Sequence, residues 1–128
     1  MNLIVYLSGT QEINNKLLKL IHRAAPDALL DVYFTIDELT ARLRQPFVDV
    51  GLAVLYAATR ADLMELIFLE NFLRELRLVL ILPDHDPSTF AKAHALRPRF
   101  LALAENDLDE LESVLKRMAE LYRRPVGI

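Results

Sequence analysis

Short apolar runs alternate with amphipathic stretches along the whole chain. Five runs rich in Val, Ile, Leu, Tyr or Phe show no polar alternation, which is typical of strands buried on both faces of a parallel sheet. These runs are Leu3–Leu7, Leu29–Phe34, Gly51–Tyr56, Leu78–Leu82 and Phe100–Leu103. After each run, apolar residues recur at helical spacing. The pattern therefore predicts five strands that alternate with five helices.

Local start signals support the predicted helices. Thr35 and Glu38 fit a capping box at the start of the second helix. Asp86 followed by Pro87 predicts the N-cap and first position of the fourth. The third helix is predicted as one unbroken element over residues 61–76, and the fifth is predicted to begin at Asn106 or Asp107.

The order of the elements predicts an α/β fold class. Strands and helices that alternate through short connections imply right-handed parallel crossovers. Five such units cannot close an eight-stranded barrel, so we expect a three-layer α/β/α sandwich. This is the flavodoxin-like (βα)5 arrangement, with a five-stranded parallel sheet in the order 2-1-3-4-5. We expect residues 1–124 to form this single domain and residues 125–128 to be a C-terminal tail.

Composition narrows the classes of function. The chain has 128 residues, a net charge of -3 and no cysteine. The missing cysteine excludes disulfides, thiolate metal sites and cysteine nucleophiles. The acidic balance gives no reason to expect nucleic acid or an anionic membrane as a partner. Residues 1–7 lack the basic start and cleavage site of a signal peptide, so we expect a cytoplasmic protein.

Candidate chemistry belongs at the carboxyl ends of the strands, because ligands bind there in open parallel sheets. Four connecting loops meet at this edge in the predicted fold: residues 8–12, 57–60, 83–86 and 104–106.

The element order and lengths over nearly the whole chain resemble the receiver domains of two-component response regulators. The best local match is the last strand and helix, RFLALAENDLDELESVLKRMAEL. The resemblance implies a site with paired acids for Mg²⁺ after strand one and a phosphoacceptor Asp ending strand three. It also implies a Thr or Ser after strand four, a Lys-Pro after strand five, and pairing of receivers through the fourth helix, fifth strand and fifth helix.

The sequence departs from the receiver pattern at each of these positions. Leu7-Ser8-Gly9 stands where the acid pair belongs, and Tyr56-Ala57-Ala58 has no carboxylate. Pro83 falls near the hydroxyl position, and Ala104-Glu105 replaces the Lys-Pro. Magnesium prefers hard oxygen ligands, so losing the acids removes the metal. We therefore expect a non-enzymatic pseudo-receiver with no cofactor and no metal, which binds a protein partner, forms a homodimer, or both.

An alternative function starts from the segment IVYLSGT, which looks like the beginning of a flavodoxin. There, Ser8, Gly9 and Thr10 match the opening of the loop that wraps the FMN phosphate at a helix N-terminus. The rest of that loop departs from the flavodoxin pattern, and Glu12 would add a negative charge beside a phosphate. The simpler interpretation is that Ser8 or Thr10 caps the first helix.

The segment Asp84-His85-Asp86 is the compact ionisable group at the predicted site edge. A histidine between two acids can bind a metal or act in acid–base catalysis, with Glu105 as the nearest further ligand. The competing interpretation is a solvated turn in which Asp86 caps a helix.

Two apolar groups offer candidate interaction surfaces. On the third helix, a core-facing stripe accounts for most apolar residues, and Leu63, Met64 and Ile67 are predicted to fall on the other side. On the fifth helix, Met118, Leu121 and Tyr122 extend beyond the core stripe. Such patches either bind a partner or pack against neighbouring parts of the same domain.

Overall fold

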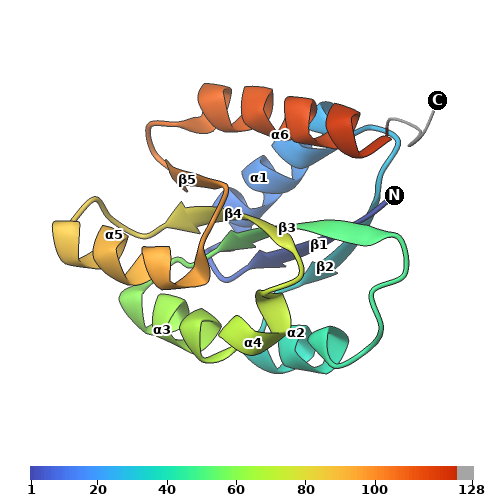
Figure 1. Cartoon of the computed structure of the whole chain (residues 1–128). Coiled ribbons are helices and arrows are strands. Elements are labelled where there is room, and N and C mark those ends of the chain that lie inside the picture. Colours follow the sequence, from blue (N-terminus) through green and yellow to red (C-terminus); the bar gives the residue numbers. More distant parts are fainter. Residues whose placement is uncertain (124–128) are drawn as a thin grey trace.

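A twisted sheet of five parallel strands lies at the centre of the computed structural model, which describes residues 1–123 (Figure 1). The strand order is β2-β1-β3-β4-β5, as the sequence predicts. The strands are β1 (Asn2–Leu7), β2 (Leu29–Tyr33), β3 (Val50–Tyr56), β4 (Arg77–Leu82) and β5 (Phe100–Leu103). This is the flavodoxin-like (βα)5 arrangement.

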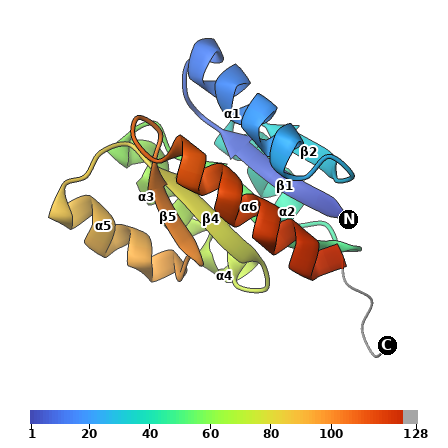
Figure 2. The same cartoon turned by 90° about the horizontal axis from the view of Figure 1, so that it is seen from above.

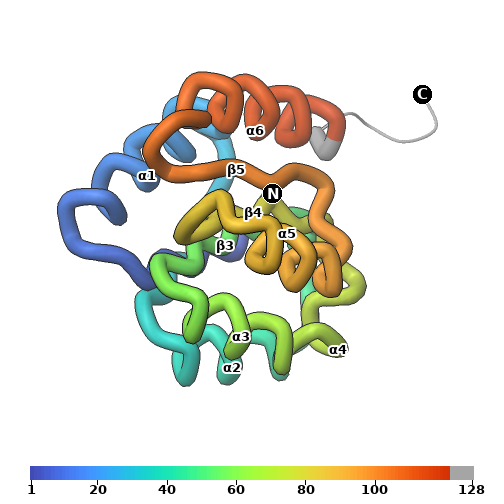
Figure 3. The backbone as a smooth tube through the Cα atoms, turned by 90° about the vertical axis from the view of Figure 1, so that its left-hand side faces the viewer, coloured from blue at the N-terminus to red at the C-terminus, as the bar shows by residue number. Residues whose placement is uncertain are grey.

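Helices cover both faces of the sheet. One face carries α1 (Gln11–Ala24) and α6 (Leu108–Arg123), which lie side by side (Figures 2 and 3). The other face carries α2 (Ile36–Leu43), α3 (Arg60–Phe68), α4 (Glu70–Leu73), α5 (Pro87–Ala93) and the 3-10 turn η1 (His94–Leu96). Each layer has its own hydrophobic core against the sheet, because the central strands bury both faces.

Side-chain caps place the starts of four helices at the carboxyl edge of the sheet. Thr10, Thr35 and Thr59 accept hydrogen bonds from the backbone N–H groups of Ile13, Glu38 and Asp62. Asp86 accepts from Ser88 ahead of α5. These contacts confirm the predicted starts at Thr35 and Asp86, and they confirm that Thr10 caps α1. Each cap satisfies an N–H group that the helix itself leaves without a partner.

The edge strand β2 departs from the prediction that the strands are buried on both faces. Its residues are half-buried, and Leu29 is 69% exposed. Asp31, in the middle of this strand, lies 3.6 Å from the Arg42 guanidinium of α2. The Arg42 side chain is only 11% exposed and also lies over the Phe47 ring.

The predicted third helix is interrupted, and this changes which residues it buries. A straight helix over residues 61–76 is wrong, because α3 ends at Phe68 and α4 begins at Glu70, with Leu69 at φ -93° and ψ 10° between them. On α3 the buried residues are Leu63 and Leu66, whereas on α4 the buried residue is Leu73. Leu63 therefore faces the core at 1% exposure, and its predicted place on the outer side is wrong. Ile67 is half-buried and packs against the same core.

None of the helices within residues 1–123 has the length and apolar character that a bilayer crossing requires. The predicted tail, residues 125–128, lies outside the described residues.

Candidate functional site at the carboxyl edge of the sheet

The loop after β1 is closed by the side chain of Asn14. Asn14 is 6% exposed and donates through Nδ2 to the carbonyl oxygens of Leu7 and Gly9, while its Oδ1 accepts from the Gly9 N–H. Thr10 Oγ1 accepts from the Ile13 N–H at 3.4 Å. A phosphate-wrapping loop needs free backbone N–H groups. Here the N–H groups of Gly9 and Ile13 already have partners within the chain.

Tyr56, the last residue of β3, lies against the same loop. A Cβ atom placed on Gly9 would stand 2.5 Å from Tyr56 Cε2, so a side chain at this position would require the ring or the loop to move. Tyr56 is 8% exposed. The side chain of Tyr56 is therefore buried. As a tyrosine, it provides no carboxylate at the carboxyl end of β3.

Ser8 joins the ends of β1 and β3. Its single O–H has two acceptors within hydrogen-bonding distance, Asp62 Oδ2 at 2.9 Å and the Tyr56 carbonyl at 3.1 Å, and its oxygen accepts from the Ala58 N–H at 2.9 Å. Asp62 lies in the first turn of α3. Its carboxylate is therefore used to fix Ser8.

Two tyrosines beside this carboxylate remain protonated at neutral pH. Burial raises the pKa of Tyr6 above its ordinary value, and the nearby Asp62 carboxylate raises it further. Burial likewise raises the pKa of Tyr56, with added contributions from Glu105 and Asp62. Neither phenol is suited to act as a general base at pH 7, because the ionised form is disfavoured by burial and by like charge.

The loop after β4 is organised by an arginine. Arg60, at the start of α3, places Nε 3.0 Å from Asp84 Oδ2 and Nη2 3.1 Å from Asp86 Oδ2. The Thr89 hydroxyl, the Arg60 guanidinium and the Asp86 N–H hold the pKa of Asp84 at about 2. The Ser88 N–H and hydroxyl and the Arg60 guanidinium lower the pKa of Asp86. Both acids are thus ionised and paired, while His85 is exposed.

A hollow of about 100 Å³ lies between the end of β3 and the loops that follow β4 and β5. Tyr56, Asp84, His85 and Glu105 are among its lining residues, so the structure does bring the predicted His85 and Glu105 to one place. Within residues 1–123, however, no three His, Asp or Glu side chains are arranged to hold a metal ion.

Sequence reasoning missed Asn14, Arg60 and Asp62 as organisers of this edge. Arg60 and Asp62 lie in the first turn of α3, just beyond the short loop after β3. Their place near the carboxyl end of a central strand was a signal that could have identified them. Asn14 gave no comparable signal, because a polar residue in a predicted helix is most simply exposed.

The exposed apolar residues on α3 and α4 differ from those that the sequence predicts. Met64, Phe68 and Phe72 are 37%, 82% and 39% exposed and follow one another at intervals of four residues. We call these three residues the exposed stripe. Of the predicted set Leu63, Met64 and Ile67, only Met64 belongs to it. On α6, Leu121 is 58% exposed and Met118 is half-buried, whereas the side chain of Tyr122 lies outside the described part of the structure.

No protein-family model and no curated protein sequence matches the chain. Solved structures do match it. The phosphorylated cyanobacterial phytochrome response regulator RcpA aligns over 94% of this chain and 92% of its own, at 16% identity and a TM-score of 0.67. The chain has the receiver fold. At these identities the likeness establishes the fold alone.

Two pilus assembly proteins share the same fold. A proposed pilus assembly-related protein from Burkholderia pseudomallei aligns at 18% identity and a TM-score of 0.68, over 94% of this chain and 90% of its own. A proposed CpaE2 pilus assembly protein from Sinorhizobium meliloti aligns at 14% identity and a TM-score of 0.65, over 91% and 98%.

Proposed function

We propose that this chain is a cytoplasmic pseudo-receiver, a non-enzymatic signalling module that works by binding protein. One observation carries the proposal. At the end of β3, where the receiver resemblance implies a phosphoacceptor Asp, the chain has Tyr56-Ala57-Ala58, and the Tyr56 ring packs against Gly9. No carboxylate stands at this position to accept a phosphoryl group.

Three acids of this edge support the same conclusion, because each already has a partner within the chain. Asp62 is hydrogen-bonded to Ser8, and Asp84 and Asp86 are paired with Arg60. A magnesium site needs carboxylate oxygens that are free to coordinate. After β5, Ala104 and Glu105 supply no cation to contact a phosphoryl group.

A phosphorylation assay tests the absence of receiver chemistry. The protein is incubated with Mg²⁺ and acetyl phosphate, or with Mg²⁺ and beryllofluoride, beside an active receiver domain as the positive control. Intact-mass spectrometry is expected to show no phosphoryl adduct, and thermal unfolding is expected to show no stabilisation by beryllofluoride. A stoichiometric adduct on this chain would contradict the proposal.

The exposed stripe is the surface that we propose for self-association. Phe68 at 82% exposure leaves a large aromatic side chain in water, and aromatic residues are enriched at protein interfaces. A homodimer with the two stripes facing each other would bury all three side chains. Interfaces of this kind often centre on a few aromatic anchors.

A matched pair of variants tests the homodimer. Phe68→Glu is expected to shift the protein from dimer to monomer in light scattering, because it places a charge at the centre of the proposed contact. Val48→Glu is the control, since Val48 is 74% exposed and lies in the loop between α2 and β3, outside the stripe. A dimer that survives Phe68→Glu, or a wild-type chain that is monomeric at high concentration, would remove the stripe as the dimer interface.

The flavin-binding alternative has a direct test. We expect added FMN to keep the absorbance and fluorescence of the free flavin, because the Gly9 N–H already donates to Asn14 and the Tyr56 ring lies over Gly9. A stoichiometric complex with quenched flavin fluorescence would instead favour the Ser8–Thr10 loop as a phosphate site.

A further inference from the structure

A groove lined by three arginines lies at the amino-terminal edge of the sheet, opposite the site described above. Arg77 begins β4, Arg99 directly precedes β5, and Arg117 lies on the second half of α6. Figure 2 shows α6 running over β4 and β5. The groove measures about 310 Å³, and its lining is completed by Val114, Met118 and Leu121. We call it the arginine groove.

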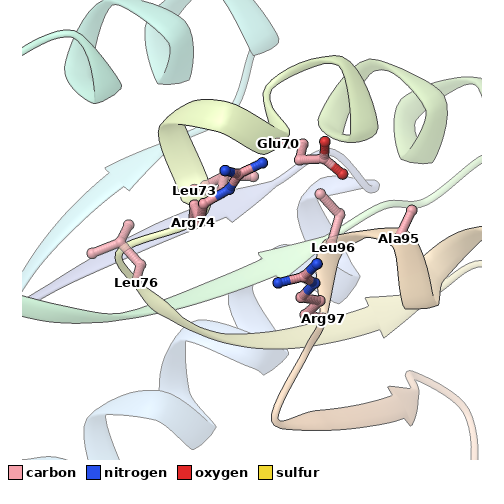
Figure 4. Close-up of a pocket in the computed structure, with 7 residues that line it drawn as sticks. All are labelled: Glu70, Leu73, Arg74, Leu76, Ala95, Leu96 and Arg97. Atoms are coloured by element: carbon pink, nitrogen blue, oxygen red, sulfur yellow. The ribbon is translucent and has the colours of Figure 1, made fainter.

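A second, smaller hollow lies at the same edge, on the other face of the sheet. Its volume is about 140 Å³, and Arg74 and Arg97 reach it from opposite sides (Figure 4). Glu70 also lines this hollow, together with apolar side chains of α4 and η1. Positive charge therefore extends around both sides of the edge where β4 and β5 begin.

The cations of the arginine groove have no partners among residues 1–123. No carboxylate within that range forms an ion pair with any of the three, and no acidic side chain lines the groove. All three arginines are exposed. Unpaired cations around a concave surface attract an anionic partner, and this happens even though the whole chain carries a net charge of -3.

The floor of the groove selects among anionic partners. Leu121 is 58% exposed and Met118 is half-buried beside it, so the cations surround an apolar surface. Arginine binds carboxylates through paired N–H donors in one plane, and arginine and methionine are both enriched at protein interfaces. A nucleic acid backbone would satisfy the guanidinium groups but would leave Leu121 in contact with charge. A protein segment that carries both carboxylates and apolar side chains satisfies both features.

We propose that the arginine groove binds an acidic, amphipathic segment of a partner protein. Its carboxylates pair with Arg77, Arg99 and Arg117, and its apolar side covers Leu121 and Met118. The inference rests on the proposed function in requiring that the domain work by binding protein. Beyond the proposed function, it specifies the chemistry of the partner and assigns its binding to a surface distinct from the exposed stripe.

The test uses the full chain and a fluorescently labelled synthetic peptide in which Leu and Glu alternate at helical spacing. Fluorescence anisotropy is expected to show saturable binding that weakens as salt is raised. The triple variant Arg77→Glu, Arg99→Glu, Arg117→Glu is expected to weaken binding by more than about tenfold, because three attractive pairs become repulsive. Leu121→Ser is expected to weaken it by about threefold to tenfold through loss of apolar contact.

The control variant is Lys16→Glu, Lys19→Glu, Lys92→Glu, which changes the net charge equally at exposed positions elsewhere. It is expected to bind the peptide within about twofold of the wild type. Circular dichroism verifies that each variant is folded. The proposal is overturned if the peptide does not bind, if the lysine control loses binding equally, or if a scrambled peptide of the same composition binds as well.

Two further outcomes separate this inference from others. A duplex DNA probe that binds more tightly than the peptide, and loses binding in the same arginine variant, would make the groove a nucleic-acid surface and overturn the proposal. A chain that is phosphorylated by acetyl phosphate yet still binds the peptide through the groove would contradict the pseudo-receiver function alone and would support the groove.

Discussion

The two ends of the sheet handle their polar groups in opposite ways. At the carboxyl edge, Ser8, Asn14 and Asp62 bond to the chain itself, and Arg60 pairs with both acids of the loop after β4. At the amino edge, the arginines around the starts of β4 and β5 carry no carboxylate partner among the described residues.

The difference shows that the place where a fold usually binds ligands is not always the place with unused binding capacity. Polar groups that are already hydrogen-bonded within the chain must break those bonds before they can bind a ligand. Exposed charges without partners can bind a ligand without first breaking a bond within the chain. The comparison therefore predicts that substitutions at the carboxyl edge affect stability, whereas substitutions at the amino edge affect binding.

The largest expected effect is at Asn14. Asn14→Ala removes the partner of the Leu7 carbonyl oxygen and of both polar backbone groups of Gly9 in a buried setting. We expect the free energy of unfolding to fall by about 2–3 kcal/mol. Urea unfolding measures the change, and Asn15→Ala, on the exposed side of the same helix, is the control. Equal stability of the two variants would show that the loop after β1 does not depend on Asn14.

Gly9→Ala is expected to lower the free energy of unfolding by a smaller amount. The added methyl group meets the Tyr56 ring, so the ring or the loop must move, at a cost of about 1–2 kcal/mol. The same substitution in a Tyr56→Leu background should cost less, because the ring edge is gone. The difference between the losses of unfolding free energy in the two backgrounds measures the steric coupling between position 9 and the Tyr56 ring. If the costs are equal, Tyr56 does not fill this space.

The effect of Arg60→Ala depends on pH. In the wild type, the pKa of Asp84 is held at about 2, below its ordinary 3.8, by the Thr89 hydroxyl, Arg60 and the Asp86 N–H. A depressed pKa contributes stability that is present above the unfolded value and is lost as pH falls from about 4 towards 2. Without Arg60 the pKa should rise towards 3.8 and the acid-dependent loss should shrink. NMR titration of the Asp84 carboxyl carbon measures this pKa in the wild type and in the variant. An equal titration midpoint in both proteins would contradict the pairing of Asp84 with Arg60.

The smallest expected effect is on stability at the amino edge. Arg77→Ala, Arg99→Ala and Arg117→Ala should each change the free energy of unfolding by less than about 0.5 kcal/mol, because exposed side chains without partners contribute little. A thermal unfolding series compares them with Asn14→Ala. A loss above about 1 kcal/mol from any of them would place that arginine in the structural framework and weaken the contrast between the edges.

Local and periodic signals were enough to predict most of the fold. The caps at Thr35 and Asp86 depend on residues two or three positions away, and the strands follow from apolar runs, so each is readable from the sequence. The break at Leu69 was not predicted, because neither glycine nor proline marks it. The burial of Leu63 and the exposure of Phe68 and Phe72 on the two sides of this break were not predicted either.

The candidate site was harder to predict than the fold. Its absent acids could be listed from the sequence, but its organising contacts join Ser8 to Asp62 and Arg60 to Asp86, across 54 and 26 residues. Contacts of that separation depend on how loops from different strands meet. Spacing along the chain carries no direct signal for them.

The ion pair between Asp31 of β2 and Arg42 of α2 also bears on how this protein can associate. An edge strand presents unpaired backbone groups that can recruit another strand, and an inward-pointing charge on it is one way that proteins discourage this. Asp31, held by Arg42, places such a charge midway along β2. A second chain that extended the sheet there would have to bury an ion pair at the junction. A charge at this position opposes continuous growth of the sheet into fibres through the β2 edge.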